Sequence, residues 1–158
     1  MTPPHESSVT PLKGESRAVP EQECLELMAT TTVGRVAFVN ADGLQLMPLN
    51  FALIDGEIYF RTATDSVLDD LTEGDARVAF GVDYHSGEFR EGWSVTVKGL
   101  AIRVSDPATY ERVMSWSRLR PWAGGTRGVV IRLIRQEMDG RRVHGDRTPK
   151  TSSTATRM

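Results

Sequence analysis

Two Asp-Gly pairs limit what this chain can fold into more than any other feature. Asp42-Gly43 follows the stretch "RVAFV", and Asp55-Gly56 follows "LQLMPLNFAL", so each pair separates runs rich in β-branched, aliphatic and aromatic residues. Asp-Gly between two such runs is typical of a tight β-hairpin, because both residues tolerate the positive φ angles of the turn. The sequence therefore predicts consecutive hairpins, an antiparallel meander, over residues 35–62.

Three more strand-like stretches follow: "ARVAFGVDY", "WSVTVKGLAIRV" and "GVVIRLIRQEM", the last expected to end near Gly140. In the second of these, the apolar positions change parity at Gly99, with Val95 and Val97 before it and Leu100 and Ile102 after it. A change of parity predicts a β-bulge or a sharp bend at the glycine.

Helical patterns are short and lie around these strands. They cover "PEQECLELM", a segment near residues 66–72, and "DPATYERVMSWSRL", which Ser105 or Asp106 would cap. Six strands with few βαβ signals predict a mainly β fold, a six-stranded antiparallel barrel, closed or half-closed, with short peripheral helices. Side chains fill a barrel of this size, so a ligand site is expected at its rim or at a subunit interface.

Length and charge exclude several classes of protein. The chain has 158 residues and a formal net charge of −2, so we expect one domain, over residues 19–145, and no general attraction to nucleic acid or membranes. Residues 1–18 and 146–158 lack periodicity and are expected to be a mobile arm and a mobile tail. Apolar runs are strand-sized and no signal peptide pattern is present, which predicts a cytoplasmic protein.

The stretch "YFRTATDSVLDDL" offers a candidate anion site. Arg61 ends a strand, and Thr62, Thr64 and Ser66 follow at the expected start of a helix. Unpaired N–H groups at a helix start, together with hydroxyl and guanidinium groups, can bind a phosphate. The alternative is structural, because Ser66 and Asp69 match a capping box, and the neighbouring aspartates would repel an anion. Both interpretations stay open on spacing alone.

Three other positions stand out. Pro48 interrupts the strand "QLMPLN" and predicts a sheet edge, where a flat ligand could dock against exposed backbone. Trp93 opens a long strand and is expected in the core or an interface. Trp122 lies in the loop "RPWAGGTRG" and would suit a lid on a pocket or an interface plug.

Motifs for metals or nucleophiles are missing from the sequence. The three histidines, at positions 5, 85 and 144, lack the companions of a zinc site, and the single Cys24 is expected to be a small buried group. Any chemistry is therefore expected to come from a cofactor, and no side chain is assigned as a catalytic residue.

The order of helix, "VGRVAFVNADGLQLMPLNFAL", "GEIYFRTATDSVLDDL", "ARVAFGVDY" and "EGWSVTVKGLAI" resembles the pyridoxamine 5'-phosphate oxidase-like family of flavin-binding split barrels, over about residues 21–145. This resemblance implies a six-stranded split β-barrel and a homodimer that holds flavin mononucleotide (FMN) in clefts between its subunits. It also implies which residues touch the cofactor: Met47, Pro48, Leu49 and Asn50 at the ring, Arg61, Thr62, Ser66 and Val67 at the ribityl chain and phosphate, and Ser94 at the ring again. Thr64 and Trp122 complete the candidate set.

Two departures from the family pattern affect the cofactor and the substrate. Many relatives have Arg or Lys directly after the serine of the phosphate loop, where this chain has Val67. Loss of one charge-assisted contact would cost roughly 1.5 to 3 kcal/mol, unless Arg35, Lys98 or Arg127 replaces it, and a deazaflavin coenzyme is the alternative cofactor. The C-terminal "RRVHGDR" has one residue more than the Arg-Leu-His-Asp-Arg segment of true pyridoxine phosphate oxidases.

The sequence thus predicts an FMN-dependent oxidoreductase acting on a small, planar substrate. The alternatives are a protein that binds or senses a flavin, a deazaflavin or haem without turnover, and pyridoxamine 5'-phosphate oxidase itself.

Overall fold

The computed structural model describes residues 14–72, 76–116, 119 and 125–145. Its elements, in chain order, are β1 (Glu15–Val19), α1 (Glu21–Met28), β2 (Val33–Asn40), β3 (Gly43–Ile54), β4 (Glu57–Thr62), the 3₁₀ helix η1 (Asp69–Thr72), β5 (Arg77–Ser86), β6 (Glu91–Arg103), α2 (Pro107–Met114) and β7 (Val129–His144).

All seven strands belong to one antiparallel sheet. The strand order is β1-β7-β4-β3-β2-β5-β6, and an additional pairing of β6 with β7 closes the last six strands of this order into a ring. The predicted split barrel is therefore confirmed, and its ring has the predicted six strands. Both Asp-Gly hairpin turns are present as well. In the second turn, φ is 51° at Asp55 and 77° at Gly56.

Strand β1 is an addition that the sequence did not predict. It pairs with the far half of β7, from Glu15 opposite His144 to Val19 opposite Gly140. The strand begins inside residues 1–18, which we expected to be a mobile arm, so ordered structure starts at least four residues before the expected boundary. Strand β7 likewise continues past Gly140 to His144. Residues 1–13 and 146–158 lie outside the described residues.

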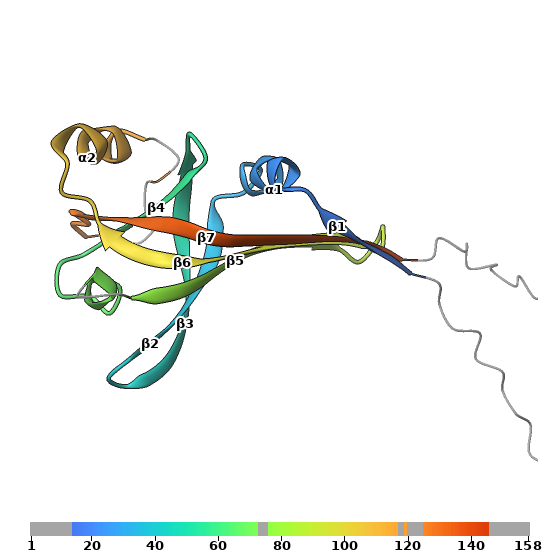
Figure 1. Cartoon of the computed structure of the whole chain (residues 1–158), viewed down its shortest axis with the longest axis horizontal. Helices are drawn as coiled ribbons and strands as arrows, with labels where there is room; N and C mark the ends of the chain where they lie inside the picture. The colour runs from blue at the N-terminus through green and yellow to red at the C-terminus, as the bar shows by residue number, and fades with distance from the viewer. Residues whose placement is uncertain (1–13, 73–75, 117–118, 120–124, 146–158) are drawn as a thin grey trace, which may run out of the picture.

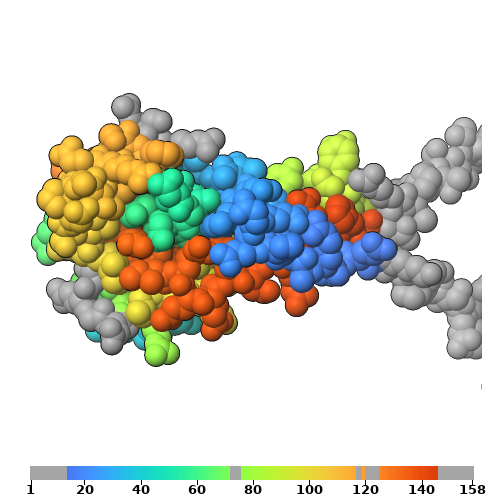
Figure 2. Space-filling view, turned by 45° about the horizontal axis from the view of Figure 1, so that its top comes forward, coloured from blue at the N-terminus to red at the C-terminus, as the bar shows by residue number. Residues whose placement is uncertain are grey.

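The barrel is split along β7. One edge of β7 pairs with β6 from Ile131 to His144, whereas the other edge pairs with β4 up to Leu133 and with β1 from Gly140. Between those two points, no strand of the described chain covers the second edge. Helix α1 lies against β7 there (Figures 1 and 2), and a Cβ at Gly140 would come within 2.4 Å of the Cys24 sulfur.

The bulge predicted at Gly99 is confirmed. Lys98 pairs with Glu137, but Gly99 pairs with Arg135, so one residue of β7 is left without a partner on β6. A Cβ at Gly99 would lie 1.9 Å from the carbonyl oxygen of Ile134. Only glycine permits this approach of the two backbones, which lets the long strands β6 and β7 bend around the barrel.

The barrel interior is a packed apolar core. Phe80 is at its centre, with its ring centroid 5.1 Å from that of Phe51 and 5.4 Å from that of Phe60. The expected burial of Cys24 is confirmed at 1% exposure, and burial raises the pKa of its thiol. A second cluster lies under α2, where Val113 packs on the outer side of β3, β4 and β7. Neither described helix has the length and apolar character that a membrane crossing requires.

Candidate functional site

The outer side of the β2–β3 hairpin carries exposed apolar residues. Leu44 is 80% exposed, Val39 72% and Leu46 66%. These three, together with Val33 and Pro48, share one side of the hairpin because side chains alternate along each strand. We call this set the hairpin face. It projects from the barrel, and no described element packs against it (Figure 1).

Pro48 lies at an open strand edge, as its missing N–H predicts. It pairs with Arg35 of β2, but the pairing of β3 with β4 starts only at Phe51. Met47 to Leu49 therefore have a strand neighbour on the β2 side alone, within the described chain. Backbone groups on the other edge are available to a ligand.

The four residues expected at the flavin ring divide between two sides of β3. Met47 and Leu49 point inward and pack against the main core. Pro48 and Asn50 point outward, with Pro48 exposed and Asn50 half-buried. Only Pro48 and Asn50 can present side chains to a ligand on the outer side, while Met47 and Leu49 would contribute backbone atoms.

Arg61 and Thr62 also point to opposite sides, because they are successive residues of β4. Thr62 is 1% exposed, and its hydroxyl lies 2.6 Å from the hydroxyl of Ser66. Arg61 lies on the outer side, where its Nε and Nη2 both donate to the carbonyl oxygen of Arg127, at 3.2 Å each. The structure thus groups Thr62 with Ser66, and Arg61 with Arg127.

The short helix expected near residues 66–72 is present in part. A turn at Ser66 leads into the 3₁₀ helix η1, which has four residues. Half of the expected capping box is present, because the Asp69 N–H donates to the Ser66 hydroxyl at 3.2 Å. The Asp69 carboxylate accepts from the Asp65 N–H at 3.1 Å, whereas the Ser66 N–H donates to the Ala63 carbonyl oxygen at 3.3 Å. The Ser66 hydroxyl, one of the groups expected at a phosphate, is thus engaged within the turn, in which Asp65 has a positive φ of 58°.

The two residues after Ser66 have different environments. Leu68 is 6% exposed and belongs to the main core, which explains why no basic residue stands there. Val67 is 40% exposed, and Thr64 is exposed as well. Both side chains are exposed, so packing within the described chain does not explain which residue stands at either position.

Of the three cations named as replacements for the missing charge, two have acidic partners. Arg35 Nη1 lies 3.1 Å from an Asp83 carboxylate oxygen, and Lys98 Nζ lies 3.0 Å from Glu137. Arg127 has no acidic group within 4.0 Å in the described part of the chain, and its buried Nε has no hydrogen-bond partner there. The sequence indicated Arg127 only as one of three replacement charges, since its place beside Arg61 depends on the pairing of β4 with β7.

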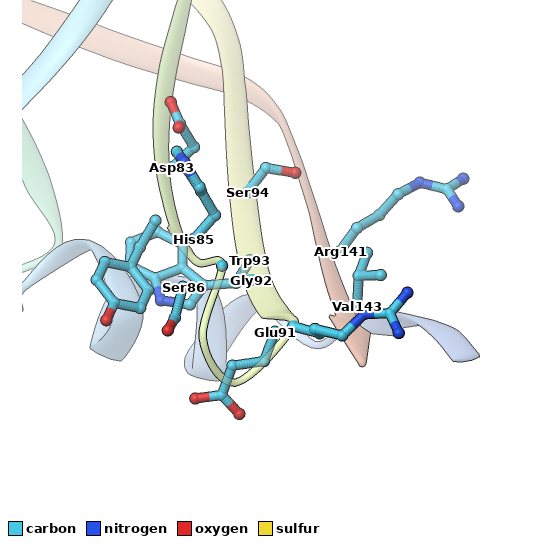
Figure 3. Close-up of a pocket in the computed structure, with 12 residues that line it drawn as sticks. Asp83, His85, Ser86, Glu91, Gly92, Trp93, Ser94, Arg141 and Val143 are labelled. Carbon is cyan, nitrogen blue, oxygen red and sulfur yellow. The ribbon is translucent and has the colours of Figure 1, made fainter. Parts of the chain in front are cut away.

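Ser94 lies on the outer side of β6, opposite Asp83 of β5 and Arg141 of β7. It lines a cavity of about 410 Å³ at the end of the β5–β6 hairpin. Figure 3 shows Ser94 and Arg141 pointing away from Trp93, which packs against the main core as expected. Trp122 lies outside the described residues.

Ser94 and Arg61 are far apart on the surface of one chain. Through β3, β2 and β5, four strand steps separate β4 from β6, a path of roughly 19 Å at about 4.8 Å a step. Through β7 only two steps separate them, but Arg61 pairs with Val130 and Ser94 with Arg141, so this path also runs along most of β7 and is longer. The candidate ring contact at Ser94 is thus remote from Arg61.

Arg142 and His144, which were weighed as substrate-binding residues of the oxidase, line a different cavity of about 150 Å³ beneath α1. Arg142 Nε lies 3.4 Å from a Glu23 carboxylate oxygen, and His144 Nδ1 lies 3.8 Å from Glu91. Two hydrogen bonds from Arg17 already hold the Glu23 carboxylate, and they lower its pKa. No group of three or more metal-ligating side chains occurs within the part of the chain that the structure describes.

Comparisons with known proteins agree with this architecture. A family model described as pyridoxamine 5'-phosphate oxidase matches residues 20–142. The uncharacterized protein Rv0080 of Mycobacterium tuberculosis is 32% identical over 133 residues, which cover 80% of this chain and 86% of Rv0080. A FAD binding protein from Mycobacterium smegmatis has a TM-score of 0.67 and 26% identity, covering 81% of this chain and 99% of its own. The fold is also that of a FAD-binding protein from Mesorhizobium loti, with a TM-score of 0.70, 24% identity, and coverage of 83% and 98%.

Proposed function

The chain belongs to the pyridoxamine 5'-phosphate oxidase family, and on this basis we propose that it binds a flavin, FMN, and works as a flavin-dependent oxidoreductase on a small, planar substrate. The observation that supports flavin binding most directly is the similarity to the FAD binding protein of M. smegmatis, which extends over 99% of that protein at 26% identity. This match covers 81% of the present chain.

The residues present fit a flavin nucleotide in two respects. The hairpin face and the open edge at Pro48 offer apolar surface and free backbone groups, which suit a flat ring that carries hydrogen-bonding atoms. Arg61 offers positive charge on the same outer side, next to Asn50 of β3, and its guanidinium contacts the main chain of Arg127. One ligand could reach both places.

A bound flavin would supply the hydride chemistry at its N5. The protein would position the ring and keep water away from it. We assign no acid or base among the side chains, because the groups at the hairpin face are apolar.

We also propose a homodimer on the basis of this surface. The hairpin face carries exposed apolar side chains, and a second copy of the chain would cover them. A second copy could also bring its Ser94 toward the Arg61 side of the first copy, which a single chain keeps roughly 19 Å away along the sheet. We therefore place the cofactor between two copies.

Spectroscopy tests the proposal in two steps. The purified full chain is mixed with FMN, FAD or no addition, gel-filtered, and its visible spectrum recorded; retained flavin bands support binding. Reduced nicotinamide cofactor is then added without air, and bleaching of the bands supports the oxidoreductase. Saturating flavin that leaves no bands would sink the proposal.

One observation favours a second candidate, a protein that binds a flavin without turnover. The hydroxyl of Ser66 is engaged with Thr62 and Asp69, and three aspartates lie within its own turn. Weak phosphate binding would suit a reversible sensor better than an enzyme. Bands that persist under every electron donor tried would favour this candidate.

A further inference from the structure

Two arginines meet where β4 ends and β7 begins. Arg61 is the second-last residue of β4, and Arg127 lies two residues before β7. The Nε and Nη2 of Arg61 both donate to the backbone carbonyl of Arg127, so the Arg61 side chain is held in one place while its Nη1 takes part in neither bond. We call these two residues the arginine pair.

The arginine pair is not neutralised by the described residues. Most of the other described arginines have a carboxylate oxygen within 4.0 Å: Arg17, Arg35, Arg103, Arg112, Arg132, Arg135 and Arg142. Neither member of the pair has one within the described chain. The Arg61 guanidinium lies against the main chain of Arg127, and neither residue has a described counter-charge, so this part of the surface is positively charged.

Arg127 gives a second indication that a ligand belongs at this place. Its Nε is buried, and no acceptor for it exists among the described groups. A buried donor on a charged group is unfavourable unless an acceptor reaches it, so an unpartnered one in a native fold points to a ligand or ion.

Sheet register connects the arginine pair to the strand of the hairpin face. The pairing of β3 with β4 ends at Phe51 opposite Phe60, so Asn50 and Arg61 are the next residues of the two strands and share the outer side. Pro48 is two residues further along β3. An extended ligand on Pro48 and Asn50 would therefore end at Arg61.

We propose that the arginine pair binds the phosphate of the flavin nucleotide. It would take the role of the basic residue that many relatives have at the position of Val67. This inference rests on the proposed function. Guanidinium groups bind phosphate oxygens through paired, charge-assisted hydrogen bonds. Arg61 belongs to β4, whereas Arg127 lies just before β7. The turn at Ser66, whose hydroxyl is occupied and whose neighbours are acidic, then has a structural role only.

The test compares three ligands that share the flavin ring and the ribityl chain: riboflavin has no phosphate, FMN has one, and FAD has a diphosphate that carries adenosine. The dissociation constants of FMN, FAD and riboflavin are measured by fluorescence titration for the wild-type full chain and for Arg127→Gln. We expect the variant to weaken FMN binding by about ten- to hundredfold, with riboflavin unchanged, because riboflavin lacks the phosphate. A loss confined to FAD would assign the pair to a diphosphate instead of a monophosphate, with the same chemistry.

The matched control is Arg77→Gln, which removes an exposed arginine of β5 that has no carboxylate partner among the described residues. It should leave every dissociation constant unchanged. Inorganic phosphate provides a measurement without mutation: it should compete with FMN and not with riboflavin on the wild-type chain. The phosphate competition on the wild-type chain still tests the role of the arginine pair if Arg127→Gln fails to fold.

The outcomes separate the two proposals. If the wild-type chain binds none of the three flavins, the proposed function fails and this inference with it. If it binds FMN and riboflavin with equal affinity, and phosphate competes with neither, the flavin site survives and the role of the arginine pair is refuted.

Discussion

The hydroxyls of Thr62 and Ser66 lie 2.6 Å apart, and together they join the end of β4 to the turn that precedes η1. Thr62 is almost fully buried, at 1% exposure, so its hydroxyl depends on this bond. Ser66 also accepts from the Asp69 N–H at 3.2 Å. The serine therefore holds the turn together from both sides.

Ser66→Ala should lower the free energy of unfolding by about 1 to 3 kcal/mol, because it removes the cap and leaves the buried Thr62 hydroxyl without its partner. Urea unfolding measures the change. Thr64→Ala, at an exposed position, is the control and should be nearly neutral. Adding Thr62→Val to Ser66→Ala should recover part of the loss, since no buried hydroxyl then remains. A stable Ser66→Ala chain with much weaker FMN binding would contradict this assignment and return Ser66 to the phosphate site.

The sequence predicted the barrel because its signals are local. Asp55-Gly56 determines a turn wherever it stands between strands, and the parity change at Gly99 identifies a bulge without knowledge of the partner strand. Strand β1 was missed for the opposite reason. Its residues, Glu15 to Val19, have no apolar alternation, and the strand exists because β7 is long enough to pair with it.

The candidate site was predicted unevenly for a related reason. Pro48 marks an open edge through its own chemistry, so the edge was predicted correctly, whereas a ligand at this edge stays a prediction. Strand alternation is enough to predict that the side chains of Arg61 and Thr62 point to opposite sides. It does not predict the hydrogen-bond partner of Arg61, because residues 61 and 127 meet only through the pairing of β4 with β7. Ser66 was ambiguous because a cap and a phosphate loop use the same residue types.

Gly99→Ala should be among the most damaging small substitutions in this chain. The added methyl group would stand 1.9 Å from the Ile134 carbonyl oxygen, a backbone atom that cannot move without breaking the β6–β7 pairing. We expect a loss of at least about 3 kcal/mol in the free energy of unfolding. Gly81→Ala is the control, because nothing lies within 4 Å of a Cβ there. If both variants unfold at the same urea concentration as wild type, the close approach at the bulge is refuted.

Asp106 gives α2 a pH-dependent cap. Its carboxylate accepts from the Thr109 N–H at 2.8 Å. Hydrogen bonding from the Thr109 side chain, and then from this N–H, holds the Asp106 pKa below its usual value of 3.8. Because the folded pKa is the lower one, the stabilisation is fully present above about pH 4 and is lost as the pH falls through the folded pKa.

Asp106→Ala should therefore lower Tm by a few degrees at pH 7, with a smaller difference from wild type at pH 3. Asp106→Asn keeps an acceptor that does not titrate, so its difference from Asp106→Ala should persist at both pH values. Thermal unfolding followed by circular dichroism checks both. A Tm difference between wild type and Asp106→Ala that grows on acidification would contradict a lowered Asp106 pKa in the folded chain.

The hairpin face provides the test of assembly. Leu44 and Leu46 are 80% and 66% exposed and stand on the same side of β3, so lysine at both positions would place two charges where a second copy is proposed to pack. We expect light scattering to give the mass of two chains for wild type and of one chain for Leu44→Lys/Leu46→Lys. The variant should still unfold cooperatively in urea, since neither side chain is buried within one copy. Flavin affinity should fall together with dimerisation, because Ser94 of a second copy would no longer reach the cofactor. Phe89→Lys, at another exposed apolar position (57%), serves as the control and should remain dimeric. A wild-type mass of one chain would refute the dimer, and a monomeric double variant that binds FMN at full affinity would refute a cofactor shared between copies.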